Sequence, residues 1–147
     1  MSRGFVVLAS FLLGVALCFG GGVISDGPEG TPIAFLPAAS PMILPGVYAG
    51  GEGGMIVAFY GLLLSPCYWA LLAWLATGNF AHRRSMLAIL LAAQYLGMVL
   101  IMWHSGVSTC WSETRALFTY RHGVSILLAG AYLAAQVFFW RSLRQER

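Results

Sequence analysis

The sequence contains few charged side chains and no lysine at all. Charged residues make up 9% of the 147 residues, whereas a soluble domain carries about 25%. Because 59% of the chain is hydrophobic, eight basic and five acidic residues could not cover its apolar surface in a water-soluble fold. The shortage of charge therefore excludes an ordinary soluble domain and predicts an integral membrane protein.

The motifs of several common activities are also absent. No two cysteines have Cys-x-x-Cys spacing, which disfavours a membrane disulfide exchanger. The apolar runs contain no carboxylate pair and no Ser-His-Asp set, so nothing predicts hydrolytic chemistry. The formal charge of +3 is not accompanied by a basic stripe or a nucleic-acid motif. We accordingly expect a non-catalytic protein that does not bind nucleic acid.

Four apolar runs are long enough to cross a bilayer, which requires about 20 residues in a helix. They predict helices over residues 5–24, 54–77, 86–107 and 123–140. The runs are continuous rather than alternating, which favours helices over barrel strands. The predicted fold is a single all-α membrane domain, a four-transmembrane-helix bundle. The first run also resembles a signal peptide with Arg3 as its basic n-region, but the length of its apolar core favours retention.

Arginines predict the orientation of these helices, because basic residues resist translocation. Six arginines fall on one side of the predicted membrane and two on the other: Arg3, Arg83, Arg84, Arg141, Arg144 and Arg147 against Arg115 and Arg121. This places both termini, the inner loop 78–85 and the tail 141–147 in the cytoplasm, and the loops 25–53 and 108–122 outside. Four of the inner arginines are candidate lipid and topology anchors: Arg83, Arg84, Arg141 and Arg144. The compact size and the short arginine-marked inner segments favour a bacterial inner membrane.

The outer loop 25–53 is rich in glycine and proline but contains an apolar stretch at 33–44. At about 12 residues this stretch is too short to span the membrane. Four prolines should prevent one regular helix through it: Pro32, Pro37, Pro41 and Pro45. We expect a partly ordered cap on the outer surface of the bundle. The alternative is a re-entrant element.

Small and polar residues within the apolar runs predict how the helices pack. Lipid provides no hydrophobic drive for helix association, so small residues that permit close backbone approach are informative. In the first run they recur every four residues, at Ser10, Gly14, Cys18 and Gly22. Other runs contain shorter pairs: Gly61 with Ser65, Ala93 with Gly97, and Gly130 with Ala134. A hydrogen bond between Gln94 and Gln136 would add roughly 0.6 to 2 kcal/mol.

One cluster of potential ligands lies near the predicted outer boundary. His104 and His122 flank the same loop, and Cys110 and Glu113 lie between them. Two imidazoles can bind haem or a metal ion, so this cluster suggests a cofactor site. It lacks a recognisable ligand spacing, and histidine is also common at membrane interfaces. The site is therefore a hypothesis, and the alternative is that the two histidines have a purely structural role.

The leading functional expectation is an accessory, scaffold or assembly subunit of a larger membrane complex. Its partners would be the lipid bilayer and other membrane subunits or further copies of the chain. One alternative is a redox or haem- or metal-binding module that uses His104 and His122. Another is a small oligomeric channel or carrier for an uncharged solute. An ion-coupled transporter is disfavoured, because every Asp, Glu and Arg lies outside or at the ends of the apolar runs.

Overall fold

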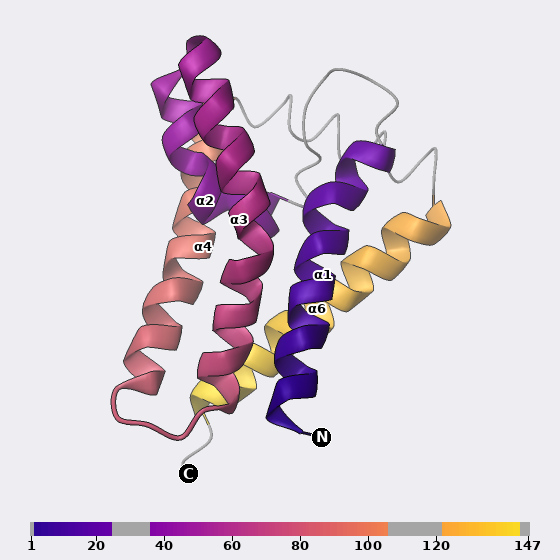
Figure 1. Ribbon diagram of the computed structural model, residues 1–147, viewed down its shortest axis with the longest axis vertical. Coiled ribbons are helices and arrows are strands. Elements are labelled where there is room, and N and C mark those ends of the chain that lie inside the picture. Colours follow the sequence, from indigo (N-terminus) through magenta and orange to yellow (C-terminus); the bar gives the residue numbers. More distant parts are fainter. Residues whose placement is uncertain (1, 25–35, 106–121, 145–147) are drawn as a thin grey trace.

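The computed structural model describes residues 2–24, 36–105 and 122–144, and all regular secondary structure in these ranges is helical (Figure 1). The helices are α1 (Arg3–Ile24), α2 (Leu36–Ala49), α3 (Gly51–Thr77), α4 (Arg83–Ser105) and α6 (His122–Arg144). The prediction of an all-α protein is therefore confirmed.

Three of these helices are long and apolar enough to cross a membrane. They are α3, the segment Arg83–Leu100 of α4 and the segment Ile126–Arg144 of α6. Large apolar side chains are exposed along their outer faces, and Leu127 is 73% exposed. Soluble monomers rarely expose continuous apolar surface of this kind. Length, composition and exposure together indicate a membrane protein.

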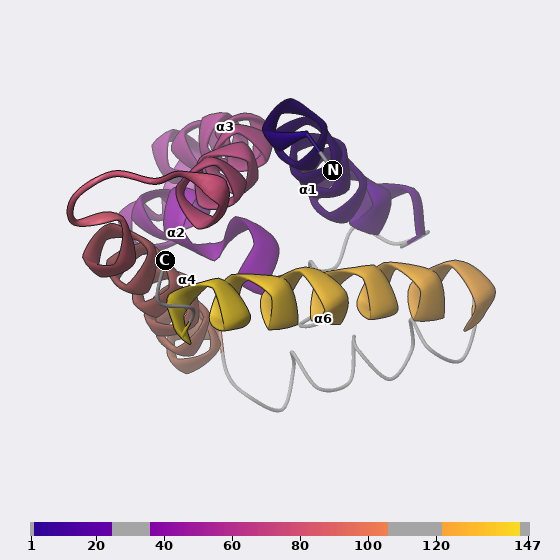
Figure 2. The same cartoon turned by 90° about the horizontal axis from the view of Figure 1, so that it is seen from below.

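The helices are arranged so that all arginines of the described residues lie at one end. Helices α1, α3 and α4 alternate in direction, while α6 crosses them at an angle and lies across one side of the bundle (Figures 1 and 2). The beginnings of α1 and α4 therefore meet the ends of α3 and α6. We call this the arginine end; its arginines are Arg3, Arg83, Arg84, Arg141 and Arg144.

Helix α2 contradicts the expectation that prolines would prevent a regular helix, because Pro41 and Pro45 both lie inside it. The chain reverses at Gly50 and Gly51, which have φ angles of 63° and 59°, and α3 then runs back along α2. Proline removes a backbone donor, but packing against neighbouring helices can hold such a segment. Helix α2 packs against both α3 and α4. It is thus part of the bundle and not a cap over its end.

The Tyr48 hydroxyl on α2 donates a hydrogen bond to the carbonyl of Leu100 on α4, at 3.3 Å.

The other helices also differ from their predicted bounds. Helix α3 begins at Gly51 rather than at residue 54, α4 begins at Arg83 rather than at 86, and α6 continues to Arg144 rather than ending at 140. Part of the predicted tail is therefore helical.

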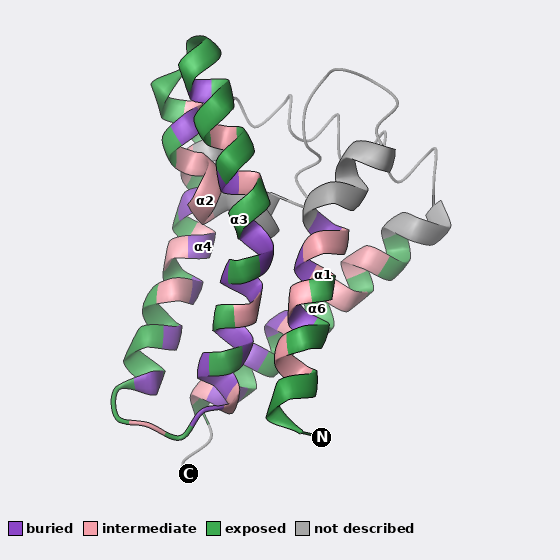
Figure 3. Cartoon of the chain, viewed as in Figure 1, coloured by how far each residue is buried: buried purple, intermediate pink, exposed green. Residues whose placement is uncertain are grey.

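The core is centred on the second half of α3, nearer the arginine end (Figure 3). Trp69 is fully buried there, and its ring lies 5.9 Å from the rings of both Tyr132 and Phe139 of α6. Apolar side chains of the other helices complete the cluster, among them Leu17 of α1 and Leu87 and Leu91 of α4.

Candidate functional site

Glycines bring α2 and the first half of α3 into direct backbone contact. A Cβ atom on Gly61 would overlap the carbonyl oxygen of Met42, and one on Gly46 would overlap the backbone of Ala58. A Cβ on Gly54 would lie 2.5 Å from the carbonyl oxygen of Gly46. Real Cβ atoms cannot be placed so close. We call this pair of helices the glycine hairpin; its small-residue contacts are Gly46, Gly54, Ala58 and Gly61.

The small-residue ridge predicted on α1 faces α3 in the part that the structure describes. Ser10 and Gly14 are buried. A Cβ on Gly14 would lie 2.9 Å from the Cα of Pro66 and 3.0 Å from the Cβ of Trp69. Cys18 and Gly22 continue the same helix, but their surroundings lie outside the described residues.

The two glutamines that interrupt the apolar runs lie together in the interior. Gln136 Nε2 donates to Gln94 Oε1 at 3.3 Å, and the Tyr95 hydroxyl donates to Gln136 Oε1 at 3.1 Å. Gln94 is completely buried and Gln136 is 5% exposed. The nearby Tyr68 hydroxyl donates to the carbonyl of Leu90. These neutral amides and phenols can hold α3, α4 and α6 together, but they supply no strong acid or base.

Two arginines cover the carboxyl-terminal end of α3, where the last carbonyls of a helix have no partner within the helix. Arg83 is only 8% exposed and donates from Nη1 to the carbonyls of Ala76 at 3.2 Å and Gly78 at 2.9 Å. Its Nη2 reaches the carbonyl of Ser142 on α6 at 3.5 Å. Arg3 donates to the carbonyl of Trp74 at 3.3 Å. Arg83 thus joins the ends of α3 and α6, a role beyond that of a topology anchor.

The other predicted anchors, Arg84, Arg141 and Arg144, are exposed at the same end of the bundle. These arginines of the predicted inner side therefore lie together with Arg83, as residues that anchor the helices to anionic lipid would.

The structure does not bring together the helix ends that carry the two predicted histidine ligands. The carboxyl-terminal end of α4, with His104, lies well apart from the amino-terminal end of α6, with His122 (Figures 1 and 2). Both side chains, as well as Cys110 and Glu113, fall outside the described residues. Among the described side chains, no group of three or more His, Cys, Asp or Glu could hold a metal ion. The haem or metal site stays a hypothesis.

The outward face of α6 carries the one predicted small-residue pair with no packing partner in the described chain. A Cβ on Gly130 would meet nothing within 4 Å, and Ala134 is exposed. Ile126, Leu133 and Val137 are exposed at helical spacing around this pair. We call these five residues the α6 face.

Sequence reasoning missed Gly46, Gly54 and Ala58, and it gave Arg83 only an orienting role. The helical spacing of small residues, continued backwards from Gly61, would have found Gly54 and Ala58. The arrangement as a whole offers surfaces for helix contact and no reaction centre among the described residues. No protein-family model, curated protein or solved structure matches this chain.

Proposed function

We propose that this protein is a non-catalytic accessory or assembly subunit of a larger membrane complex, and that the α6 face docks on a helix of its partner. The observation that carries the proposal is the open space at Gly130. Glycines at equivalent positions of other helices, such as Gly14 and Gly61, are filled by a neighbouring backbone. Small residues are useful in membrane helices where another helix approaches closely.

The attachment of α6 supports the same proposal. Among the residues of α6 whose burial is described, 126–144, the buried ones are Gln136, Phe139 and Ser142, and all belong to the part nearest the arginine end. Further towards its beginning, Leu127 and Leu133 are exposed. The part of α6 nearest the arginine end is therefore the more deeply packed in this chain. Nearer its beginning, the inner side still contacts the core through Leu128 and Tyr132, while the outer side presents an apolar, small-residue surface that a second membrane helix can cover.

We also propose that α1 is a fourth membrane span. Its 22 residues correspond to about 33 Å of helix, and the hydrocarbon layer is about 30 Å thick. The 14 residues of α2 correspond to about 21 Å, which is too short to cross. Helix α2 is then a re-entrant half-helix on the outer side. The arginine end faces the cytoplasm, so that both termini lie on the cytoplasmic side of a bacterial inner membrane.

The docking proposal is tested by purifying the tagged chain in mild detergent and identifying the chains that accompany it. A stoichiometric membrane partner is expected with the wild type. It should be lost with Gly130→Leu and retained with Ala92→Leu, a matched change at an exposed small residue of α4. If the chain purifies alone as a monodisperse species, the docking proposal is wrong.

The same preparation separates the alternatives. If the accompanying chain is a further copy of this protein, and liposomes that contain it pass an uncharged solute, the oligomeric channel replaces the accessory subunit. A haem absorption band or a stoichiometric metal would instead favour the module that uses His104 and His122.

The orientation is tested separately with single cysteines in a chain whose native cysteines are replaced by serine. Ala81→Cys, in the turn at the arginine end, should resist an impermeant maleimide in intact cells. Ala49→Cys, beside the Gly50 turn, should react. The reverse pattern would invert the topology.

A further inference from the structure

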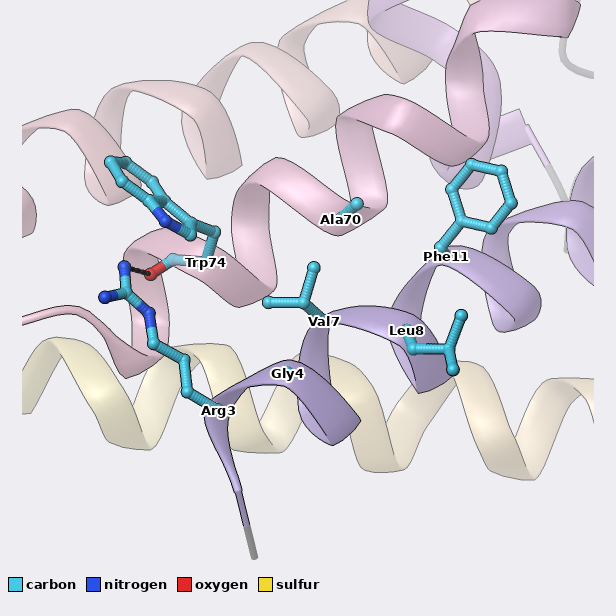
Figure 4. Close-up of a pocket in the computed structure, with 7 residues that line it drawn as sticks. All are labelled: Arg3, Gly4, Val7, Leu8, Phe11, Ala70 and Trp74. Carbon is cyan, nitrogen blue, oxygen red and sulfur yellow. Dashed lines mark hydrogen bonds between the residues drawn. The ribbon is translucent and has the colours of Figure 1, made fainter.

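A groove of about 510 Å³ lies between α1 and α3, close to the arginine end (Figure 4). Its walls are apolar along most of its length, with Val7, Leu8 and Phe11 from α1 and Ala70 from α3. Its end is different, because Arg3 and Trp74 lie there together. The groove therefore combines apolar walls with a single positively charged end.

Arg3 is placed to bind an additional anion. Its guanidinium lies 5.0 Å from the centre of the Trp74 ring and donates one hydrogen bond, to the Trp74 carbonyl. A guanidinium has five N–H donors in a fork that matches phosphate oxygens, so the described contacts of Arg3 leave most of them for a ligand. The side chain is also exposed, which gives such a ligand access.

The surrounding charges favour an anion at this position. The first turn of α1 contains no acidic residue to balance the positive end of the helix. Within the described ranges the only carboxylate side chain is that of Glu52, which lies in the first turn of α3 at the opposite end of the bundle. Besides the carbonyl at the end of α3 that Arg3 contacts, which carries only a partial negative charge, the end of the groove has a formal positive charge and no described counterion.

The length of the groove matches the depth of a lipid leaflet. The interval from Arg3 to Phe11 covers about 12 Å along a helix, and one hydrocarbon leaflet is about 15 Å thick, half of the bilayer core. Tryptophan and arginine at the ends of membrane helices lie at the level of the headgroups. An acyl chain that begins beside Trp74 would then follow the apolar wall.

We propose that this groove binds a phospholipid with a net negative headgroup, from the leaflet at the arginine end. The phosphodiester accepts hydrogen bonds from Arg3, and an acyl chain lies against Val7, Leu8, Phe11 and Ala70. This site lies on α1 and α3, away from the α6 face, and does not depend on a protein partner.

The proposal is tested in nanodiscs that contain a trace of photoactivatable phosphatidylglycerol or phosphatidylcholine with identical acyl chains. Crosslinked peptides are then located by mass spectrometry. Phosphatidylglycerol should label the segments 4–11 and 70–74 several-fold more than phosphatidylcholine. Arg3→Gln should lower the phosphatidylglycerol signal about fivefold, the value expected for one arginine near anionic lipid. Arg3→Lys should retain most of it.

Two further variants distinguish the effect of the apolar wall from the effect of positive charge at this end of the bundle. Ala70→Phe fills the apolar wall and should lower the labelling by both lipids, whereas Arg144→Gln, an equal charge change at the same end, should leave the groove signal unchanged. Equal labelling of the wild type by the two lipids would overturn the proposal. So would an unchanged signal in an Arg3→Gln chain that melts like the wild type. If Arg3→Gln does not fold, the comparison of the two lipids on the wild type decides alone.

Discussion

The glycine hairpin and α6 use the same small residues in opposite ways. In the hairpin, the backbone of α2 occupies the space beside Gly54 and Gly61, so that no side chain would fit. On α6 the space beside Gly130 is open. A glycine in a membrane helix therefore indicates close approach but not which helix approaches. Filled glycines build this fold. Gly4 and Gly53 are open as well, but they lie in the first turns of α1 and α3, whereas Gly130 is open well inside a helix and indicates where something else can bind.

The two regions are also held by different interactions. The hairpin depends on backbone contact over the length of α2, which gives dispersion contacts without a large hydrophobic contribution. Helix α6 is held by ring contacts of Tyr132 and Phe139 with Trp69 and by hydrogen bonds. The hydrogen bonds join Gln136 to Gln94 and Arg83 to the Ser142 carbonyl. Substitutions should consequently affect the two regions by different amounts.

The largest effect is expected from Gly61→Leu. The new side chain would overlap the carbonyl of Met42 and crowd the nitrogen of Ile43, which lies 3.0 Å from an added Cβ. The helices must separate, because neither contact is with a flexible side chain. We expect a loss of about 3 kcal/mol in the free energy of unfolding, measured by circular dichroism in mixed micelles with increasing dodecyl sulfate.

Gly130→Leu is the matched control for Gly61→Leu. It makes the same change of residue type where an added Cβ has no neighbour within 4 Å, so the unfolding midpoint of the isolated chain should remain close to that of the wild type. A Gly61→Leu chain that is as stable as the wild type would show that the backbones of α2 and α3 are not in close contact.

The second effect is expected at Arg83. Arg83→Gln removes hydrogen bonds to three carbonyls on two helix ends, Ala76, Gly78 and Ser142. Hydrogen bonds to charged groups contribute about 1.5 to 3 kcal/mol, and water can reach part of this end, so we expect a loss of about 2 kcal/mol in the same unfolding assay.

Two variants distinguish this stabilising role of Arg83 from its role as a topology charge. Arg83→Lys keeps the positive charge but not the guanidinium fork, so it should keep the orientation while losing part of the stability. Arg141→Gln alters an exposed charge nearby and should change the stability by no more than about 0.5 kcal/mol. A stable Arg83→Gln chain with altered orientation would assign Arg83 to topology alone.

The third effect concerns the amide pair. Gln136→Leu removes the hydrogen bonds with Gln94 and Tyr95 and should cost about 1 kcal/mol, within the range for polar contacts between membrane helices. The double variant Gln94→Leu/Gln136→Leu should cost less than the sum of the single variants, because it leaves no amide buried beside an apolar group. Strictly additive losses in this double-mutant cycle would indicate that the two side chains do not interact.

Much of the architecture could be predicted from the sequence because lipid imposes strong rules. Three long helices followed from apolar runs, and the two glutamines within those runs, Gln94 and Gln136, lie within hydrogen-bond distance. A polar side chain in an apolar interior has few possible partners. The pairing of these two glutamines therefore had few alternatives.

The remaining features could not be predicted because they depend on tertiary contacts. Proline penalties alone exclude a helix at Pro41 and Pro45, but the neighbouring α3 and α4 hold α2 in place. The positive φ angles of Gly50 and Gly51 form the reversal of the hairpin, and a glycine-rich sequence does not show where the chain will reverse. The contacts of Arg83 with the ends of α3 and α6 could not be predicted either, because the sequence does not show which helix ends will meet.

The smallest expected effect gives the sharpest comparison, because its sign should differ between the two regions. Glycine inside a helix is less favourable than alanine by about 0.5 to 1 kcal/mol. At Gly130 the added methyl group meets no atom within 4 Å, so Gly130→Ala should raise the free energy of unfolding by up to this amount. At Gly54 the same methyl group would lie 2.5 Å from the Gly46 carbonyl, and Gly54→Ala should lower it. Thermal unfolding of the two variants beside the wild type measures both signs. A decrease with Gly130→Ala would mean that the α6 face is already in contact with another helix in the isolated preparation, most simply that of a second copy.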